Sequence, residues 1–269
     1  LTLNRQLTLL PAEAGERVLP NLDRNIKCGN SLIGPDYFSG QMLPDEAELR
    51  RVNPFDWARE FPEAMKAGGF DCVIGNPPYL FITELDNDEK AYFFSHYQTS
   101  EYRFDVYGLF IELAIRELMR RGGYLSFIIP HSLLSNDSFE KLRRLLLTES
   151  FLESVIDIGP GVFAGAKNES MIFLAQNNKA RNPTEITHVI LTTAQTFPKP
   201  VKEFRVKQGT WLDAPKSAWL IKVSGNDMAV VEKLERSPSR LGDLCTINQG
   251  LRTGDNERYL SSVPKSGKW

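Results

Sequence analysis

Cysteine and histidine are scarce in this chain, with three of each among 269 residues. Cys28, Cys72 and Cys245 lie too far apart to form a metal-binding motif, and they suggest no obvious disulfide set. The sequence therefore predicts no metal site. Because proteins without disulfides are typical of reducing compartments, we expect a cytoplasmic protein.

Long apolar runs are also lacking. No stretch approaches the roughly 20 apolar residues that a membrane span needs, and we find no signal peptide. Hydrophobic residues (42%) and charged residues (25%) occur in ordinary proportions, which indicates a globular protein without a membrane partner. A chain of this length can form one large domain or two small ones.

A strong charge of either sign is missing too. The formal net charge is −2 at pH 7, so the overall charge gives no sign of nucleic-acid binding. This counts mildly against a DNA-binding protein, although a local basic groove on a nearly neutral protein would be enough.

The segment with the most specific chemistry is residues 70–79, Phe-Asp-Cys-Val-Ile-Gly-Asn-Pro-Pro-Tyr. The apolar run 72–74 predicts a short buried strand that stops at Gly75. Pro78 has no backbone donor and forces Pro77 into an extended conformation, so the chain leaves the strand as a stiff loop. Ligands bind at the carboxyl ends of strands in open α/β sheets, which makes this loop a candidate site.

The loop offers a side-chain amide oxygen on Asn76, a main-chain carbonyl on Pro77 and the aromatic face of Tyr79. Two acceptors held close together can take both hydrogens of an exocyclic amino group, while the ring stacks on the planar system that carries it. An adenine amino nitrogen is a poor nucleophile because its lone pair is delocalised into the ring. Pulling on both hydrogens favours a pyramidal nitrogen whose lone pair can attack an electrophile, which stabilises the transition state.

Asn76-Pro77-Pro78-Tyr79 resembles the catalytic loop of S-adenosylmethionine-dependent amino-methyltransferases, above all those that methylate adenine N6 in DNA. The resemblance implies that all four residues are catalytic, that S-adenosyl-L-methionine is the cofactor and that the substrate is a flipped adenine in double-stranded DNA. It is greatest toward the methyltransferase region of type IIG restriction–modification enzymes and their relatives in phage defence. Fused or associated nuclease and specificity modules would be the expected partners.

The same resemblance implies a Rossmann-like α/β methyltransferase sheet, partial because its early strands are missing, followed by the start of a target-recognition domain. The likeness runs over most of residues 1–178 and more weakly over 235–260. We therefore expect the C-terminal part of a catalytic domain in residues 1–178. Residues 179–269 would hold a linker and the beginning of the target-recognition domain.

The pattern of apolar residues predicts the elements of this sheet. Helical periodicity over 109–119 ends at Gly122-Gly123, and a second helix carries a buried stripe over 139–146. Continuous or alternating apolar runs indicate strands at 124–130, 152–158, 170–175 and 186–191.

Residues 26–28 predict a further short strand, with Asn30 and Ser31 at its carboxyl end. In the methyltransferases a corresponding strand end supplies a polar side chain to the adenine of the cofactor. The resemblance thus assigns Asn30, Ser31 and Asn76 to cofactor binding. For Asn30, an Asx-type turn after a strand is nearly as good an explanation.

Three residues after the catalytic loop are candidates for contact with the DNA. His131 follows the strand at 124–130, where it is either a target contact or a polar loop residue. Phe163 matches the position at which the methyltransferases supply a second aromatic ring. Tyr79 and Phe163 would then sandwich the flipped base and restore part of its lost stacking, with an ordinary core role for Phe163 as the alternative. Lys167, in the same loop as Phe163, is assigned to a DNA phosphate.

Near the end of the chain, Gly250-Leu-Arg-Thr-Gly254 resembles the turn that opens a target-recognition domain in the large DNA methyltransferases. Arg252 on this turn would contact a phosphate or a guanine edge. The alternative is a glycine-rich hairpin with a solvated arginine.

The main departure from the family is the lack of a glycine-rich loop (Phe-x-Gly-x-Gly-like) ahead of Asn76, where such enzymes bind the methionine end of the cofactor. The chain also opens at Leu1 inside the end of an amphipathic helix. We therefore expect a truncated methyltransferase that is inactive alone. Two other hypotheses stay open: a protein glutamine-N5 methyltransferase, which shares the tetrapeptide, and a non-catalytic DNA-binding remnant.

Overall fold

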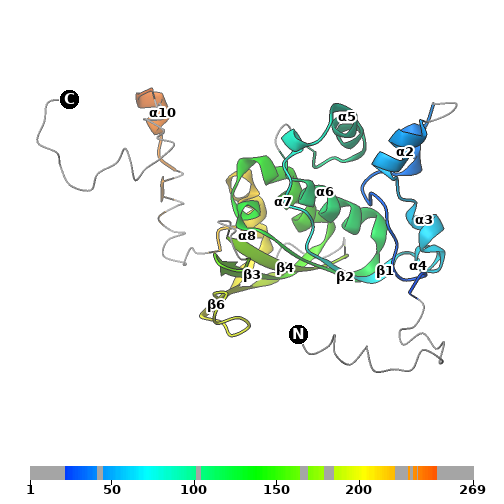
Figure 1. Ribbon diagram of the computed structural model, residues 1–269. Coiled ribbons are helices and arrows are strands. Elements are labelled where there is room, and N and C mark those ends of the chain that lie inside the picture. Colours follow the sequence, from blue (N-terminus) through cyan, green and yellow to red (C-terminus); the bar gives the residue numbers. More distant parts are fainter. Residues whose placement is uncertain are drawn as a thin grey trace, which may run out of the picture. The chain divides into compact units, whose positions relative to one another are not determined.

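The computed structural model describes residues 22–40, 45–100, 104–163, 169–178, 185–221, 230, 233–234 and 236–246. The chain divides into two compact units, Leu1–Ile221 and Lys222–Trp269. The first unit holds the strands described below (Figure 1). In the second unit the structure describes helix α10 (Leu241–Leu244). None of the described helices is long and apolar enough to cross a membrane.

A six-stranded mixed sheet with the order β1-β2-β4-β3-β5-β6 forms the centre of the first unit. β1 runs parallel to β2, and β5 runs parallel to β3. β4 lies antiparallel between β2 and β3, and β6 lies at the far edge, antiparallel to β5. The predicted α/β class is confirmed. The strands are β1 (Phe70–Gly75), β2 (Met119–Pro130), β3 (Phe151–Gly159), β4 (Ser170–Gln176), β5 (Ile186–Leu191) and β6 (Lys202–Lys207).

The helices gather mainly on one face of the sheet, where Figure 1 shows α6 and α7 alongside the strands. This arrangement buries the apolar stripe of each helix against the sheet. The helical elements of the first unit are η1 (Pro35–Phe38), α2 (Glu46–Val52), α3 (Trp57–Glu60), α4 (Pro62–Lys66), η2 (Ile82–Glu84), α5 (Asn87–His96), α6 (Val106–Leu113), η3 (Ala114–Leu118), η4 (His131–Leu134), η5 (Asp137–Phe139), α7 (Glu140–Glu149), α8 (Gln208–Asp213) and η6 (Pro215–Ser217).

β2 begins earlier than its apolar run indicated. The predicted helix ends as a π-helical turn at Leu118, and Met119 already pairs with Phe70 of β1. The absence of a side chain at Gly123 allows β1 and β2 to approach this closely. A Cβ at that position would lie only 2.9 Å from the carbonyl oxygen of Phe70. The glycines that were expected to end a helix therefore lie inside a strand.

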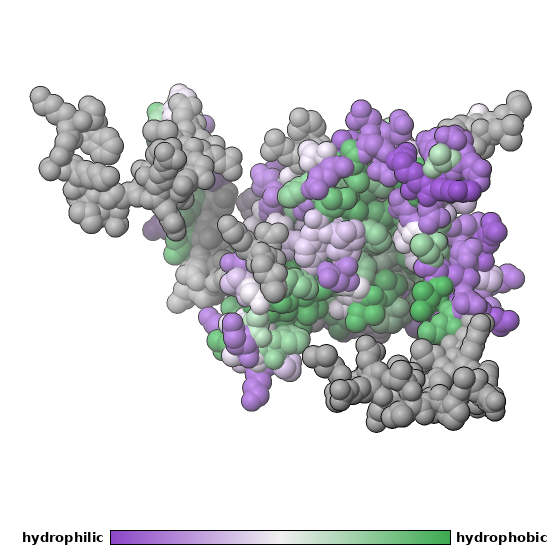
Figure 2. Space-filling view, in the orientation of Figure 1, coloured by the Kyte–Doolittle hydropathy of each residue, from purple (hydrophilic) through white to green (hydrophobic). Residues whose placement is uncertain are grey.

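Residues 72–74 lie in a strand that ends at Gly75, as predicted, but the prediction that this strand is buried is wrong. Among the described strands β1 pairs with β2 alone, so it lies at an edge of the sheet. Val73 packs toward the core, whereas Cys72 is exposed and Ile74 is 81% exposed. Apolar residues gather over the strand region in Figure 2, while hydrophilic residues cover α2 and α5.

The strand predicted at residues 26–28 is also not formed. This segment has no ladder partner, and Ile26 is exposed. The pairing is reduced to an isolated bridge between Asn30 and Pro54, in which the Asn30 N–H donates to the carbonyl of Asn53 at 2.7 Å. A single bridge cannot hold the preceding residues in register as a strand.

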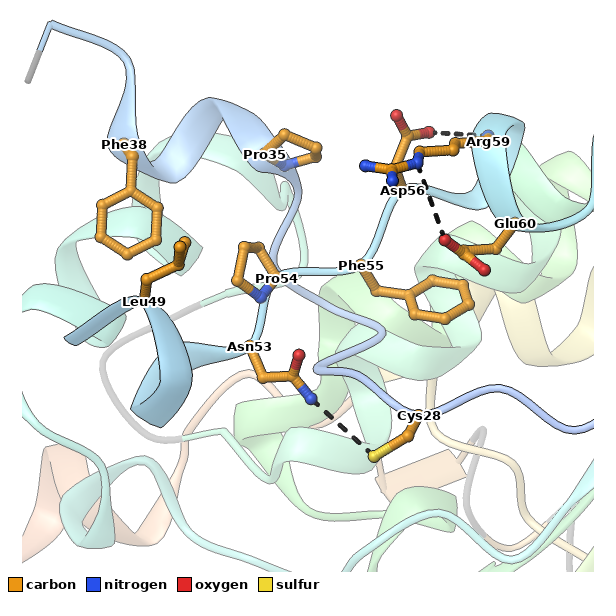
Figure 3. Close-up of a pocket in the computed structure, with 10 residues that line it drawn as sticks. All are labelled: Cys28, Pro35, Phe38, Leu49, Asn53, Pro54, Phe55, Asp56, Arg59 and Glu60. Atoms are coloured by element: carbon orange, nitrogen blue, oxygen red, sulfur yellow. Dashed lines mark hydrogen bonds and ion pairs between the residues drawn. The ribbon is translucent and has the colours of Figure 1, made fainter. Parts of the chain in front are cut away.

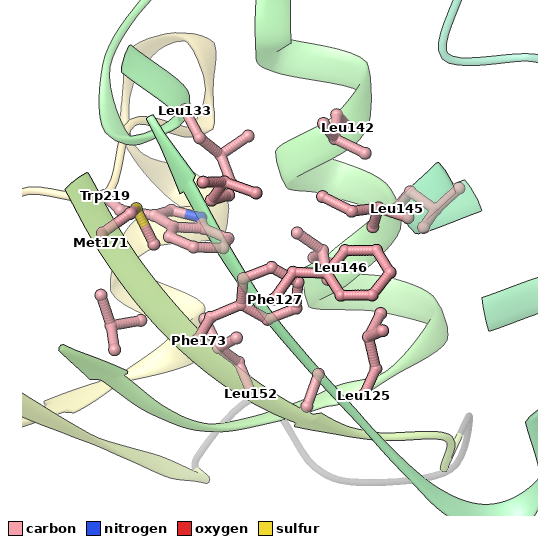
Figure 4. Close-up of a cluster of buried hydrophobic side chains, with 14 of the residues drawn as sticks. Leu125, Phe127, Leu133, Leu142, Leu145, Leu146, Leu152, Met171, Phe173 and Trp219 are labelled. Atoms are coloured by element: carbon pink, nitrogen blue, oxygen red, sulfur yellow. The ribbon is translucent and has the colours of Figure 1, made fainter. Parts of the chain in front are cut away.

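The larger of two apolar clusters fills the space between the sheet and α7. Leu142, Leu145 and Leu146 of α7 meet Phe127 of β2 and Phe173 of β4 (Figure 4). These α7 residues follow the spacing of one helical face, which is why the sequence predicted a buried stripe there.

The same cluster includes residues well beyond position 178. Trp211 and Trp219 are almost completely buried in it and stack on each other, with ring centroids 5.5 Å apart. β5 also extends the sheet by pairing with β3. The first compact unit therefore continues to Ile221, past the boundary expected after residue 178. The assignment of the later residues to target recognition stays a prediction.

A second cluster packs the N-terminal elements against the other side of α6. Leu109 and Leu113 of α6 are buried with Leu32 and Tyr97, and the Tyr97 hydroxyl donates to the carbonyl of Leu32 at 2.8 Å. α6 contributes residues to both clusters, and the second cluster also contains Leu80 and Ile82 from the segment after β1. This segment therefore packs against α6.

Candidate active site

The Asn-Pro-Pro-Tyr loop leaves β1 directly beside β2. β1 stops at Gly75, opposite Phe127. Asn76 is exposed on the loop, Pro77 is buried, and Tyr79 is half-buried. The Tyr79 hydroxyl donates to the carbonyl of Ile128 at 3.0 Å, one residue past the end of the β1 pairing. Burial raises the pKa of Tyr79, so the phenol stays protonated and remains a donor.

Two aromatic rings lie next to Tyr79. The ring of Phe163 is 6.3 Å from it with an interplanar angle of 72°, and the ring of Tyr107 is 6.4 Å away at 82°. The structure thus brings Tyr79 and Phe163 together. Their planes meet edge to face, so the pair does not form the two parallel walls of a sandwich in this conformation.

A cavity of about 380 Å³ opens beside Tyr79. Its volume lies in the range of roughly 300–1,000 Å³ that is usual for ligand sites. It collects residues from the carboxyl ends of β1 and β2, which is where ligands bind in open α/β sheets. The described residues that line it are Tyr79, Phe81, Asp105, Pro130, His131, Ser132 and Glu169.

The lining of this cavity is aromatic and acidic. His131 lies between two carboxylates, with Nε2 3.6 Å from Asp157 Oδ2 and Nδ1 3.8 Å from Glu169 Oε2. Its backbone N–H donates to the carbonyl of Glu169 at 2.9 Å. An acidic cavity suits a ligand with N–H donors better than a phosphate. The role of His131 as a DNA contact stays a prediction.

Asp105 is a member of this lining that the sequence did not single out. It immediately precedes α6, so its position is that of an ordinary helix N-cap. Its side chain is 5% exposed and caps no helix N–H. Burial, with a smaller contribution from the charge of Glu84, raises the pKa of Asp105 to about 6. In the sequence, Asp105 was recognisable only as an aspartate at the start of a helix. That pattern by itself predicts a helix N-cap and gives no sign of a site residue.

Asn30 and Ser31, the predicted cofactor residues, lie away from the Tyr79 cavity lining. Asn30 Oδ1 accepts the backbone N–H of Leu32 at 3.3 Å, as in an Asx-type turn. The carbonyl of Ser31 accepts the indole N–H of Trp57 at 3.1 Å. Ser31 and Trp57 line a separate cavity of about 340 Å³ that also holds Asp36.

A third cavity of about 530 Å³ shares Pro35, Phe55 and Asp56 with the Ser31 cavity. Figure 3 shows its lining, where the Asn53 amide donates to Cys28 Sγ at 3.8 Å. Neither of these two cavities shares a described lining residue with the Tyr79 cavity. The two remaining predicted DNA contacts, Lys167 and Arg252, lie outside the described residues.

Known proteins resemble this chain in sequence. The family described as Eco57I restriction-modification methylase matches residues 3–163. The type II restriction enzyme and methyltransferase RM.Eco57I of Escherichia coli is 26% identical, over 98% of this chain and 26% of its own length. The type II methyltransferase M.PaeR7I of Pseudomonas aeruginosa is 28% identical, over 75% of this chain and 37% of its own length. The chain therefore spans well under half of these two relatives.

Among solved structures, the type IIG restriction endonuclease BpuSI is 16% identical with a TM-score of 0.46, covering 64% of this chain and 23% of that one. The family match carries the assignment, because it covers more than half of the chain. It includes β1, β2 and the Asn76–Tyr79 loop, so the resemblance to the methyltransferases of restriction–modification enzymes is confirmed. The chain belongs to the Eco57I restriction-modification methylase family.

Proposed function

We propose that this chain forms part of the catalytic region of a DNA adenine-N6 methyltransferase in a restriction–modification or phage-defence enzyme. The observation that carries the proposal is the loop Asn76–Tyr79 at the carboxyl end of β1, beside an aromatic and acidic cavity. Relatives in the family are named as type II methyltransferases and restriction enzymes, which supports double-stranded DNA as the substrate and a fused nuclease as a partner. The enzyme would act in the cytoplasm.

The loop would act on a flipped adenine through three groups. Asn76 Oδ1 and the carbonyl of Pro77 would accept the two N6 hydrogens, which frees the nitrogen lone pair to attack. Tyr79 would stack on the base, and its bond to Ile128 fixes the ring in place. Phe163 lies at the edge of Tyr79 and would contact the base from a second side. The product nitrogen gains a methyl group and releases one proton to solvent.

S-adenosyl-L-methionine would supply the methyl group on a sulfonium centre. The cavity beside Ser31 and Trp57 suits an adenosine, because it combines an aromatic ring with polar groups such as Asp36. No glycine-rich loop ahead of Asn76 is present in the sequence for the methionine end. Of the residues predicted to bind the cofactor, Ser31 lines this cavity, and Asn30 and Asn76 are retained as proposed cofactor contacts.

An adenine substrate is favoured over a protein glutamine by the number of aromatic rings. Tyr79 and Phe81 line the cavity proposed for the base, and Phe163 lies beside Tyr79, so a planar heteroaromatic ring has aromatic faces on which to stack. A glutamine side chain presents a single amide and gains less from them. The proposal for target recognition in the later residues, with Arg252 as a contact, is retained.

The test is mass spectrometry of nucleosides from DNA of cells that express the full parent gene. We expect N6-methyladenine with the wild-type protein and its loss with Asn76→Ala, because one of the two N6 acceptors is removed. Asn87→Ala is the matched control, since Asn87 is an exposed residue of α5. N6-methyladenine in the Asn76→Ala cells at wild-type levels, or none in wild-type cells with folded protein, would contradict the proposal.

A further inference from the structure

Asp105 is 5% exposed, and it lines the Tyr79 cavity directly before α6. Three other aspartates precede described helices and accept backbone N–H groups there: Asp45, Asp56 and Asp86, at 2.8–3.2 Å. Asp105 occupies the same kind of position before α6, yet its side chain accepts no such bond. No described residue forms a hydrogen bond or ion pair with this carboxyl. It lines the Tyr79 cavity instead.

The backbone holds Asp105 at a fixed distance from the catalytic loop. Asp105 forms an antiparallel bridge with Phe81, two residues after Tyr79. On either side of it, Ile82 N–H donates to the carbonyl of Phe104 at 3.1 Å and Val106 N–H donates to the carbonyl of Leu80 at 2.8 Å. These two hydrogen bonds place the backbone of Asp105 beside Phe81, close to the loop that ends at Tyr79.

An unpaired carboxylate is costly in this setting, whereas the neutral acid is not. The pKa of Asp105 is raised to about 6, first by burial and then by Glu84. A neutral carboxyl has one O–H donor, which a carboxylate lacks. Among the described residues that line the cavity, the other ionisable groups are Tyr79, whose hydroxyl already donates to Ile128, and His131 and Glu169, which face each other. Tyr107, whose ring lies 6.4 Å from that of Tyr79, is buried.

We propose that Asp105, as the neutral acid, donates a hydrogen bond from its carboxyl O–H to a ring nitrogen of the base that enters the Tyr79 cavity. The inference rests on the proposed function. Asn76 and Pro77 would engage only the N6 hydrogens, so the acceptor nitrogens of adenine still need a donor. Asp105 would therefore be a further residue that holds the methylated base, through a hydrogen bond that only its neutral form can donate.

The experiment uses the full parent protein, S-adenosylmethionine and unmethylated genomic DNA, with N6-methyladenine measured between pH 6 and pH 9. The neutral acid is present below the pKa of Asp105 and is lost above it. Wild-type activity should therefore fall on the alkaline side, by up to about tenfold per pH unit. Asp105→Asn keeps an N–H donor that does not titrate, so it should retain activity at pH 6 and lose this alkaline decline.

Two further variants separate this role from a structural one. Asp105→Ala should lower activity at every pH, because the donor is gone. Glu84→Gln should move the alkaline decline to lower pH, because the charge of Glu84 raises the pKa of Asp105. Asp88→Asn, an exposed residue of α5, is the matched control and should leave the profile unchanged.

The outcomes distinguish this inference from the function on which it rests. Suppose that the wild type makes N6-methyladenine. The role of Asp105 alone would then be overturned if the pH profile of Asp105→Asn were identical to that of the wild type. It would also be overturned if Asp105→Asn were as inactive as Asp105→Ala. No N6-methyladenine from the folded wild-type protein at any pH would overturn the proposed function and this inference with it.

Discussion

At the scale of single residues, two polar side chains near the loop differ in whether they are hydrogen-bonded within the protein. The Tyr79 hydroxyl donates to the carbonyl of Ile128, and this bond fixes the orientation of the aromatic ring. The Asp105 carboxyl caps no helix N–H, which leaves it available for the ligand contact proposed above. A buried polar group in a folded protein almost always has a partner, and an exception beside a cavity therefore points to function.

The Tyr79 contact leads to a prediction about stability and activity. Tyr79→Phe keeps the ring and loses one hydrogen bond, so we expect a loss of about 1 kcal/mol in the free energy of unfolding and near-normal methylation by the parent enzyme. Tyr79→Ala removes the ring, and methylation should fall roughly 10- to 100-fold, because stacking of a base on an aromatic side chain is worth about 1–3 kcal/mol. Denaturant unfolding followed by circular dichroism and a methyltransfer assay measure the two effects. Equal activity of the two variants would show that Tyr79 does not stack on the base.

At the scale of elements, the sheet depends on strands that come late in the chain. β4 separates β2 from β3 and pairs antiparallel with both, while β5 and β6 extend the sheet further. The segment after β6 returns to the main cluster, where the backbone N–H of Trp219 donates to the carbonyl of Leu134 at 2.8 Å. Residues 185–221 are therefore structural parts of the unit that carries the catalytic loop.

This arrangement predicts that a late tryptophan stabilises the whole first unit. Trp219→Ala should lower the free energy of unfolding by about 3–5 kcal/mol, because a large buried side chain leaves a cavity. Leu244→Ala is the control, since Leu244 in α10 is 73% exposed and its loss should change stability by less than about 0.5 kcal/mol. Denaturant unfolding of the 269-residue chain, followed by circular dichroism, gives both values. A change below 1 kcal/mol for Trp219→Ala would mean that residues 185–221 fold independently of the catalytic loop.

At the scale of the whole molecule, the chain holds the proposed catalytic loop but lacks the glycine-rich loop that the resemblance led us to expect ahead of it. The family match and the loop assign it to a group of methylases. The sequence has no glycine-rich loop ahead of Asn76 for the methionine end of the cofactor. β1, which carries the catalytic loop, leaves one edge and one face uncovered among the described residues.

From this we expect the isolated 269-residue chain to transfer no methyl groups to DNA, whereas the full parent enzyme should do so. The physical reason is that half a binding site cannot orient the methyl donor in line with the attacking nitrogen. Incubation of the purified chain with methyl-labelled S-adenosylmethionine and DNA measures this directly, with the parent enzyme as the positive control. Incorporation of label by the isolated chain would refute the expectation.

The sequence by itself determined the loop and the family, and it predicted the chemistry that the loop would perform. Asn-Pro-Pro-Tyr after an apolar run is a local signal, since two prolines restrict the backbone whatever surrounds them. The apolar runs of β3, β4 and β5 were likewise identified within one or two residues. Such patterns are local, and so they can be read without knowledge of the fold.

Only the tertiary structure decided which strand faces are covered and which polar groups have partners. Residues 72–74 are apolar, and periodicity alone could not tell a central strand from an edge strand such as β1. Asp105 has the sequence position of a helix cap, and only its burial beside Tyr79 without a hydrogen bond distinguishes it from Asp86. Burial and pairing depend on residues far apart in the chain, and this is the physical reason why local sequence does not determine them.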